Sequence, residues 1–137
     1  MRKEFDKSLN AIARPALEKH GYTFDGKRKF IRKIENRKEL VIEYQVGIRA
    51  AQGTFTVNLI DGNEFERLSM IKPTLLSKIA NRVFGQYDPW WKGIFLPKDK
   101  WWKISPFQKE MDSIVEKTVK ELEAYGISWL EGRGNAT

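Results

Sequence analysis

A regular alternation of side chains between Glu39 and Arg49 constrains the fold of this chain more than any other feature. The even positions carry Leu40, Ile42, Tyr44, Val46 and Ile48, and the odd positions carry Val41, Glu43, Gln45, Gly47 and Arg49. Because successive side chains of a strand point to opposite faces of a sheet, this pattern predicts a β-strand. One of its faces is expected in the core, and the other is expected to be wet or covered.

Two further segments are rich in β-branched and aromatic residues, Lys29 to Glu35 and Gly53 to Ile60. The links that join them to the central strand, 36–38 and 50–53, are short enough for hairpins. The sequence therefore predicts an antiparallel meander of three strands. Residues 61–71 suit either a helix or a short fourth strand, so we leave both alternatives open.

Three segments carry apolar residues at helical spacing. The first begins near Phe5 and ends at Gly21, and Pro15 inside it predicts a kink or a break into two short helices. The second begins at Pro73 and stops at Gly85. The third is expected to open with a capping box made by Ser105 and Gln108 and to end at Gly126.

This order of elements predicts an α+β fold in which an antiparallel sheet of three to four strands carries an N-terminal, a middle and a C-terminal helix on its apolar face. We expect one domain over residues 1–130, followed by a tail at 131–137 that frays. Cytoplasmic localisation is the expectation, because the charged N-terminus has no apolar signal region and no stretch approaches the length of a membrane span.

Composition removes several classes of chemistry. The chain has no cysteine and a single histidine, His20. Thiol nucleophiles, disulfides, cysteine-based metal sites and histidine-based triads therefore have almost no support, and we expect no cofactor. An enzyme is not the leading hypothesis. His20 is expected to lie at the C-terminal end of the first helix, where a cation is favoured.

The net charge is +7, and it is unevenly distributed. Residues 1–49 hold 13 Lys and Arg against 7 Asp and Glu, whereas residues 105–137 hold 4 against 6. The basic character is therefore N-terminal and central. Such an excess attracts acidic or phosphate-rich partners, although it also serves solubility.

A tryptophan-rich segment is the most unusual local feature. Trp90 and Trp91 are followed by Lys92, and Trp101 and Trp102 are followed by Lys103. One interpretation is structural, with indoles that plug the edge of a small core. The other is an exposed aromatic platform for a protein partner, a base or a sugar. In adjacent pairs we expect at most one indole to enter the same core, because neighbouring side chains of extended chain point opposite ways.

A basic hairpin is the second unusual feature. It comprises Lys27, Arg28, Lys29, Arg32, Lys33, Arg37 and Lys38. These side chains could track phosphates or an acidic protein surface. They could equally protect an edge strand from pairing with other chains.

A magnesium-dependent nuclease needs only clustered carboxylates and a lysine. Asp25, Glu43 and Gln45 approach such a pattern on adjacent strands, with Gln45 in place of the lysine. The more ordinary interpretation puts Glu43 and Gln45 on the solvent face of their strand. We therefore predict no metal site.

The order of several short motifs resembles the bacterial family called domain of unknown function 4304. The motifs are Phe5, Leu9, Leu17 and Gly21-Tyr22, then Phe30-Ile31-Arg32, then the strand Gly53 to Leu59, then Trp90-Trp91 and a closing amphipathic helix. The resemblance covers roughly residues 3–125 and implies a compact bacterial α+β protein with no established catalytic residues. Small families of this kind often travel on mobile elements or beside toxins, where members act as immunity or accessory binding proteins.

The leading hypothesis is therefore a non-enzymatic binding protein that uses the tryptophan segment to contact another protein. The first alternative is a nucleic-acid-binding module that combines the basic hairpin with the Lys-flanked tryptophans, and the second is the metal-dependent nuclease. No membrane partner is expected. A homo-oligomer would form through an uncovered edge of the sheet.

Overall fold

A computed structural model describes residues 2–34, 38–62, 64–71 and 100–135 of the chain. The helical elements are α1 (Arg2–Ser8), η1 (Leu9–Ala13), α2 (Arg14–Glu18), η3 (Arg49–Ala51), η4 (Leu68–Met70), α5 (Gln108–Glu121), η5 (Leu122–Gly126) and α6 (Ile127–Asn135). The strands are β1 (Thr23–Phe24), β2 (Lys29–Lys33), β3 (Glu39–Val46), β4 (Thr54–Asp61), β5 (Glu64–Arg67) and β6 (Trp102–Lys103).

The strands form one antiparallel sheet in the order β1-β2-β3-β4-β5. The long strand β4 pairs with β6 through Thr54 and Phe55, and it pairs with β5 from Asn58 onward. Strands β5 and β6 therefore occupy the same side of β4 at opposite ends. This confirms the predicted antiparallel meander, with a sheet larger than expected because the two-residue strands β1 and β6 are too short to show any periodicity.

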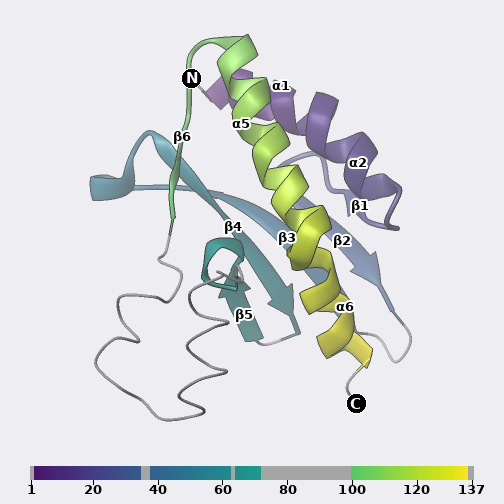
Figure 1. Cartoon of the computed structure of the whole chain (residues 1–137). Coiled ribbons are helices and arrows are strands. Elements are labelled where there is room, and N and C mark those ends of the chain that lie inside the picture. Colours follow the sequence, from purple (N-terminus) through teal and green to yellow (C-terminus); the bar gives the residue numbers. More distant parts are fainter. Residues whose placement is uncertain (1, 35–37, 63, 72–99, 136–137) are drawn as a thin grey trace, which may run out of the picture.

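Two helical segments cover one face of the sheet (Figure 1). The N-terminal segment runs through α1, η1 and α2, and the C-terminal segment through α5, η5 and α6. They pack against each other and enclose a core whose largest fully buried side chains are Tyr22, Tyr44, Phe5, Phe30, Phe55, Leu9, Leu17, Leu40, Ile42, Leu59, Leu68 and Met111. The α+β class and the position of these helices on the apolar face are confirmed. The expected middle helix, 73–85, lies outside the described residues.

Both helical segments contain a π-helical turn close to the residue that was expected to interrupt the helix, Pro15 in the first and Gly126 in the second. Pro15 follows η1, in which the wider turn lets the Arg14 N–H donate to the Leu9 carbonyl. The segment is thus divided into two short α-helices, α1 and α2, and a π-helical turn joins them just before Pro15. At Gly126 the prediction of a helix end is wrong, because η5 carries the helix onward into α6. A Cβ on Gly126 would lie 2.7 Å from the Leu68 side chain, so the glycine provides close packing instead of a terminus. The helix also continues to Asn135, across residues that were expected to fray.

The predicted capping box is also wrong. Helix α5 begins at Gln108 without a side-chain cap, and the Ser105 hydroxyl instead accepts a hydrogen bond from the Phe107 N–H at 3.1 Å. The Gln108 amide donates to the Ser8 hydroxyl at 2.8 Å and to the Glu4 carbonyl at 3.0 Å. Gln108 therefore joins the two helical segments, because a tertiary acceptor competes with the local one.

The opposite face of the sheet carries no described helix. Its cross-strand register aligns a row that runs from Lys29 through Glu43 and Asn58 to Arg67. A parallel row contains Ile31, Val41, Ile60 and Phe65. For residues 61–71 the sequence left a helix and a strand as alternatives. The structure has strand β5 followed by the 3-10 turn η4, so the strand alternative is confirmed for the first half of this region.

Among the described residues, no helix is long and apolar enough to cross a membrane.

Candidate functional site

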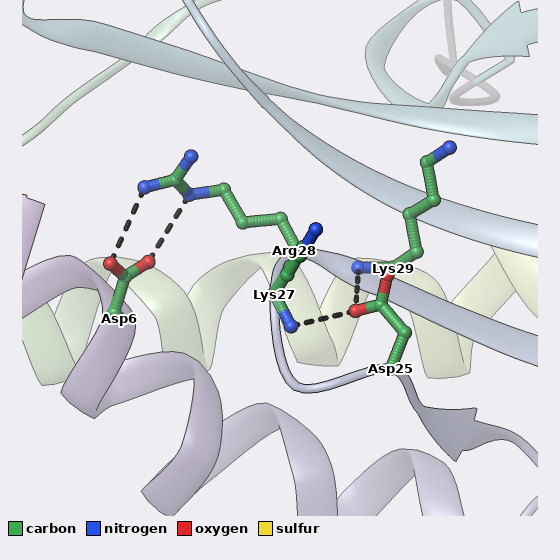
Figure 2. A network of polar contacts seen from close by, with 5 residues as sticks. All are labelled: Asp6, Asp25, Lys27, Arg28 and Lys29. Carbon is green, nitrogen blue, oxygen red and sulfur yellow. Dashed lines mark hydrogen bonds and ion pairs between the residues drawn. The ribbon is translucent and has the colours of Figure 1, made fainter.

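The tight turn between β1 and β2 is held by a single carboxylate. Oδ1 of Asp25 accepts hydrogen bonds from the backbone N–H groups of Lys27 at 2.8 Å and Lys29 at 3.1 Å (Figure 2). Gly26 adopts a φ of 85°, a conformation that side-chain-bearing residues rarely occupy. An Asp followed by Gly is a typical turn sequence for this reason. The turn therefore presents Lys27 and Lys29 in defined positions.

A second carboxylate ties the same turn to the N-terminal helix. The Arg28 guanidinium donates to the two oxygens of Asp6 at 3.1 and 3.3 Å, as Figure 2 shows. Its carbon also lies 5.7 Å from the centre of the Phe5 ring. Arg28 is thus committed to an internal ion pair and a cation–π contact, and it anchors the turn to α1.

A surface pocket of about 500 Å³ opens beside this turn, where β3 runs past the beginning of β2. We call it the turn pocket, and its lining includes Asp25, Lys27, Lys29, Glu43, Gln45 and Ile48. Lys27 and Lys29 are exposed, and Ile48 is 70% exposed. The turn pocket therefore combines cations with an apolar side chain at one edge of the sheet.

The acidic and amide groups of the turn pocket are held by hydrogen bonds. The Asn58 amide donates to Oε1 of Glu43 at 3.1 Å and to Oε1 of Gln45 at 2.7 Å. Oε2 of Glu43 lies 3.8 Å from the Lys29 ammonium nitrogen. Asn58 is itself almost fully buried, with 4% of its surface exposed. These bonds fix the two β3 side chains against β4.

Asp25, Glu43 and Gln45, which approach a nuclease pattern in the sequence, do meet at the turn pocket. Two of the three are carboxylates, and both already accept hydrogen bonds from the protein. Within the described ranges, no group of three or more His, Cys, Asp or Glu side chains is placed to hold a metal ion.

Two further cations of the basic hairpin are paired inside the molecule. Arg32 forms an ion pair with Glu131 of α6, and Lys38 lies 2.8 Å from Oδ1 of Asp61. Lys33 is exposed at the far end of β2, and neither it nor Lys27 has an ion-pair partner among the residues that the structure describes. Arg37 lies outside those residues.

The two described tryptophans of the tryptophan-rich segment differ in burial. Trp102 is 6% exposed and stacks on Phe55, with ring centres 5.7 Å apart. Trp101 is half-buried, and the Arg67 guanidinium lies 4.9 Å from its ring centre. The expectation that only one indole of this pair enters the core is confirmed. Lys103 is exposed, 3.8 Å from Glu110, whereas Trp90, Trp91 and Lys92 lie outside the described residues.

The sheet separates the two features that the sequence makes prominent. Trp102 pairs with Phe55 of β4, Phe55 pairs with Val46 of β3, and the turn pocket lies beyond Val46. Because neighbouring strands lie about 4.8 Å apart, Trp102 and the basic turn stand on opposite sides of β3 and β4. Trp102 and the basic turn therefore do not form one continuous patch.

His20 lies beyond the end of α2 and contacts Glu123 of η5, with 3.1 Å between its Nε2 and the carboxylate. It links the two helical segments at a distance from the turn pocket.

No protein-family model, curated protein or solved structure shows a significant match to this chain.

Sequence reasoning found most residues of the turn pocket but not their grouping. Lys27 and Lys29 belong to the basic hairpin, and Asp25, Glu43 and Gln45 to the carboxylate pattern. The Asp25-Gly26 pair, a typical turn sequence, is a signal that could have located the tight turn but was not used. Ile48 was assigned to the core face of a long strand, and its exposure follows from the end of β3 at Val46.

Proposed function

We propose that this chain is a small non-enzymatic binding protein and that the turn pocket is its contact surface for another protein. The observation that carries the proposal is the combination of two exposed, positioned lysines with the exposed Ile48 in one open pocket. Protein interfaces commonly join an apolar contact to a charged rim that selects the partner. The hydrogen bonds of Asp25 support this role, because they hold the lysines in place before binding.

The bonding of the pocket's carboxylates also favours binding over catalysis. A general base or a metal ligand needs an oxygen available for substrate or ion. Both oxygens of Glu43 are engaged, Oε1 by Asn58 and Oε2 by Lys29, and Oδ1 of Asp25 serves the turn backbone. We therefore place the metal-dependent nuclease last among the three hypotheses.

The charge pattern of the hairpin favours an acidic protein surface over a nucleic acid. A phosphate-tracking surface needs a series of available cations along the backbone path. Arg28, Lys29, Arg32 and Lys38 are each matched by a carboxylate of the same chain. The available cations near the turn pocket are then few, which suits a short acidic segment.

The resemblance to the family called domain of unknown function 4304 is part of this proposal. It would assign the chain to small bacterial accessory proteins, where immunity-like binding of a partner protein is a common role. We also propose a cytoplasmic location, since a reducing compartment suits a chain that has no cysteine.

The test is affinity capture with the full chain as bait, compared with the double variant Lys27→Glu, Lys29→Glu. Charge reversal at the turn pocket should lower the recovery of a specific partner at least tenfold, because like charges now face it. Lys33→Glu is the matched control, as it reverses an exposed cation of the same strand about 13 Å from Lys29.

Equal loss with Lys33→Glu would contradict a contact at the turn pocket and indicate a general charge effect. Retention of mixed DNA and RNA by the chain at low salt, with a steep decrease at physiological salt, would favour the nucleic-acid alternative. Recovery of the same proteins by the double variant and by the unmodified chain would refute the proposal.

A further inference from the structure

The backbone of β3 is paired on both sides only along part of its length. The last cross-strand pair with β2 joins Lys29 to Glu43, and one further bond runs from the Tyr44 N–H to the Arg28 carbonyl at 2.8 Å. On the other side, pairing with β4 continues to Val46, and the Gly47 N–H donates to the Thr54 carbonyl at 2.8 Å. Strand β3 therefore extends beyond β2 by several residues.

The polar groups of Val46 point toward the side that β2 leaves open. Hydrogen-bonding direction alternates from one residue to the next in an antiparallel strand. Tyr44 bonds toward β2 and Gly47 bonds toward β4, so the N–H and C=O of Val46 face the β2 side. The residue that would pair with Val46 in this register is Gly26, which belongs to the tight turn.

No hydrogen bond to Val46 on this side occurs within the described part of the chain. The turn pocket is lined by Val46 and Ile48 at this place, so the backbone groups open onto it. An unpaired N–H and C=O on an extended strand form a template for another strand.

We propose that the protein partner supplies an extended segment that pairs with β3 at Val46, in line with β2 and next to the Asp25 turn. This inference rests on the proposed function and specifies how the turn pocket binds. From Gln45 to Ile48 the chain offers about 13 Å of backbone, of which Gln45 and Val46 belong to β3, enough for a segment of three or four residues. Exposed Ile48 offers an apolar contact at the end of that path.

The charge of the turn pocket selects an acidic segment. Lys27 and Lys29 flank the open edge. Lys29 lies 3.8 Å from Oε2 of Glu43, whereas Lys27 has no ion-pair partner among the described residues. A second copy of this chain would bring the same lysines together, and like charges oppose that pairing. The lysines that prevent self-association thus attract a segment with glutamate or aspartate side chains.

The experiment uses the full chain, labelled with ¹⁵N, and a capped seven-residue peptide of alternating valine and glutamate. The peptide should shift the backbone amide signals of Val46, Lys27 and Lys29 at millimolar concentration. A lysine-for-glutamate peptide should bind at least tenfold more weakly. The same glutamate peptide, N-methylated at alternate amides on the pairing edge, should lose binding because its hydrogen bonds are blocked.

Val46→Pro provides the matching change in the protein. Proline removes the N–H that faces the turn pocket without removing a hydrogen bond to β4, and edge positions of this kind tolerate it. We expect about tenfold weaker binding of the glutamate peptide, whereas Val46→Ala, which keeps the N–H, should change affinity by less than about threefold. Urea denaturation of both variants checks that the fold is retained, and the methylated peptide tests the pairing even if Val46→Pro unfolds.

Three results would overturn strand pairing. The first is a Val46 amide unmoved by the glutamate peptide, and the second is a methylated peptide that binds as tightly as the unmethylated one. The third is a Val46 amide shift that depends on protein concentration in the absence of peptide, which would identify a second copy as the occupant.

If strand pairing fails while the double variant Lys27→Glu, Lys29→Glu still loses the captured partner, the proposed function stands without this binding mode. Binding of a thymidine oligonucleotide that leaves Val46 unmoved would contradict both.

Discussion

The two sides of the sheet use their conspicuous side chains in opposite ways. On the β6 side, β6 pairs with β4, and its Trp102 stacks on Phe55 and is nearly inaccessible, so this end of β4 is closed. On the β2 side, the chain turns away at Asp25 and leaves the backbone of β3 open beside two lysines. The conspicuous tryptophan therefore contributes to stability, and the charged residues build the candidate binding surface.

The largest expected effect tests the closed side. Trp102→Ala should lower the free energy of unfolding by about 3–5 kcal/mol, because it removes a buried indole and leaves a cavity against Phe55. Urea denaturation followed by circular dichroism measures the change. Lys103→Ala, at the exposed neighbour, should stay within about 0.5 kcal/mol. A loss below about 1 kcal/mol for Trp102→Ala would show that this edge is not closed by the indole.

Tyr44 of β3 lies between the two sides and tests the core that they share. Its buried hydroxyl lies 2.7 Å from that of Thr118, which itself donates to the Val115 carbonyl at 2.7 Å. Tyr44→Phe should therefore cost about 1 kcal/mol at pH 7, since the Thr118 oxygen loses its donor. Val57→Ala is a control for the loss of packing alone, as it deletes buried methyl groups without a hydrogen bond.

The effect of Tyr44→Phe on the free energy of unfolding should also depend on pH. Burial raises the pKa of Tyr44 above the ordinary value near 10, so the folded state keeps the hydroxyl protonated while the unfolded state ionises. Its contribution is complete below pH 10 and is lost as the pH rises beyond that value. The stability difference between Tyr44→Phe and the unmodified chain should therefore narrow above pH 10 in urea titrations. A difference that stays constant up to pH 11 would contradict the burial of this hydroxyl.

The smallest expected effect tests the open side. Asp25→Ala removes the acceptor of two backbone N–H groups and should cost at most about 1 kcal/mol of unfolding free energy. The local effect should be larger, because the amide signals of Lys27 and Lys29 lose their hydrogen-bond partner. Amide hydrogen exchange measures this loss of protection.

Asp25→Asn is the matched control, since its carbonyl oxygen still accepts hydrogen bonds. It should preserve most of the protection of the Lys27 and Lys29 amides. If the Lys27 and Lys29 amides exchange no faster in Asp25→Ala than in Asp25→Asn and the unmodified chain, the carboxylate does not organise the turn. The comparison between a closed edge and a preorganised open edge would then lose its basis.

Sequence patterns predicted the long elements of the fold well, because their periodicity is a local property. The strand pairs β2–β3 and β3–β4 follow from alternation and short links. The ends of the C-terminal helix did not follow. Gln108 found a tertiary acceptor on α1, and Gly126 packs against Leu68, so local capping rules were overridden by packing. Strands of two residues, such as β6, carry no periodic signal at all.

The candidate site was predictable in its residues and not in its arrangement. Lys27 and Lys29 were predicted as part of a basic hairpin, and Asp25 as part of a carboxylate pattern. The leading hypothesis from the sequence used the tryptophan-rich segment as the contact surface, yet Trp102 lies in the core. An indole serves equally well as a core side chain or as an anchor, so composition alone does not decide between them.

The sequence by itself determined the antiparallel α+β architecture, since side-chain periods of two and of about 3.6 residues are written along the chain. Only the tertiary structure decided which charges are available. Arg28 meets Asp6 across 22 positions of sequence, and Arg32 meets Glu131 across 99. Ion pairing depends on the distance between two charges in space, which the linear sequence does not specify. For the same reason, the open edge at Val46 emerges only where β3 continues after β2 has turned away.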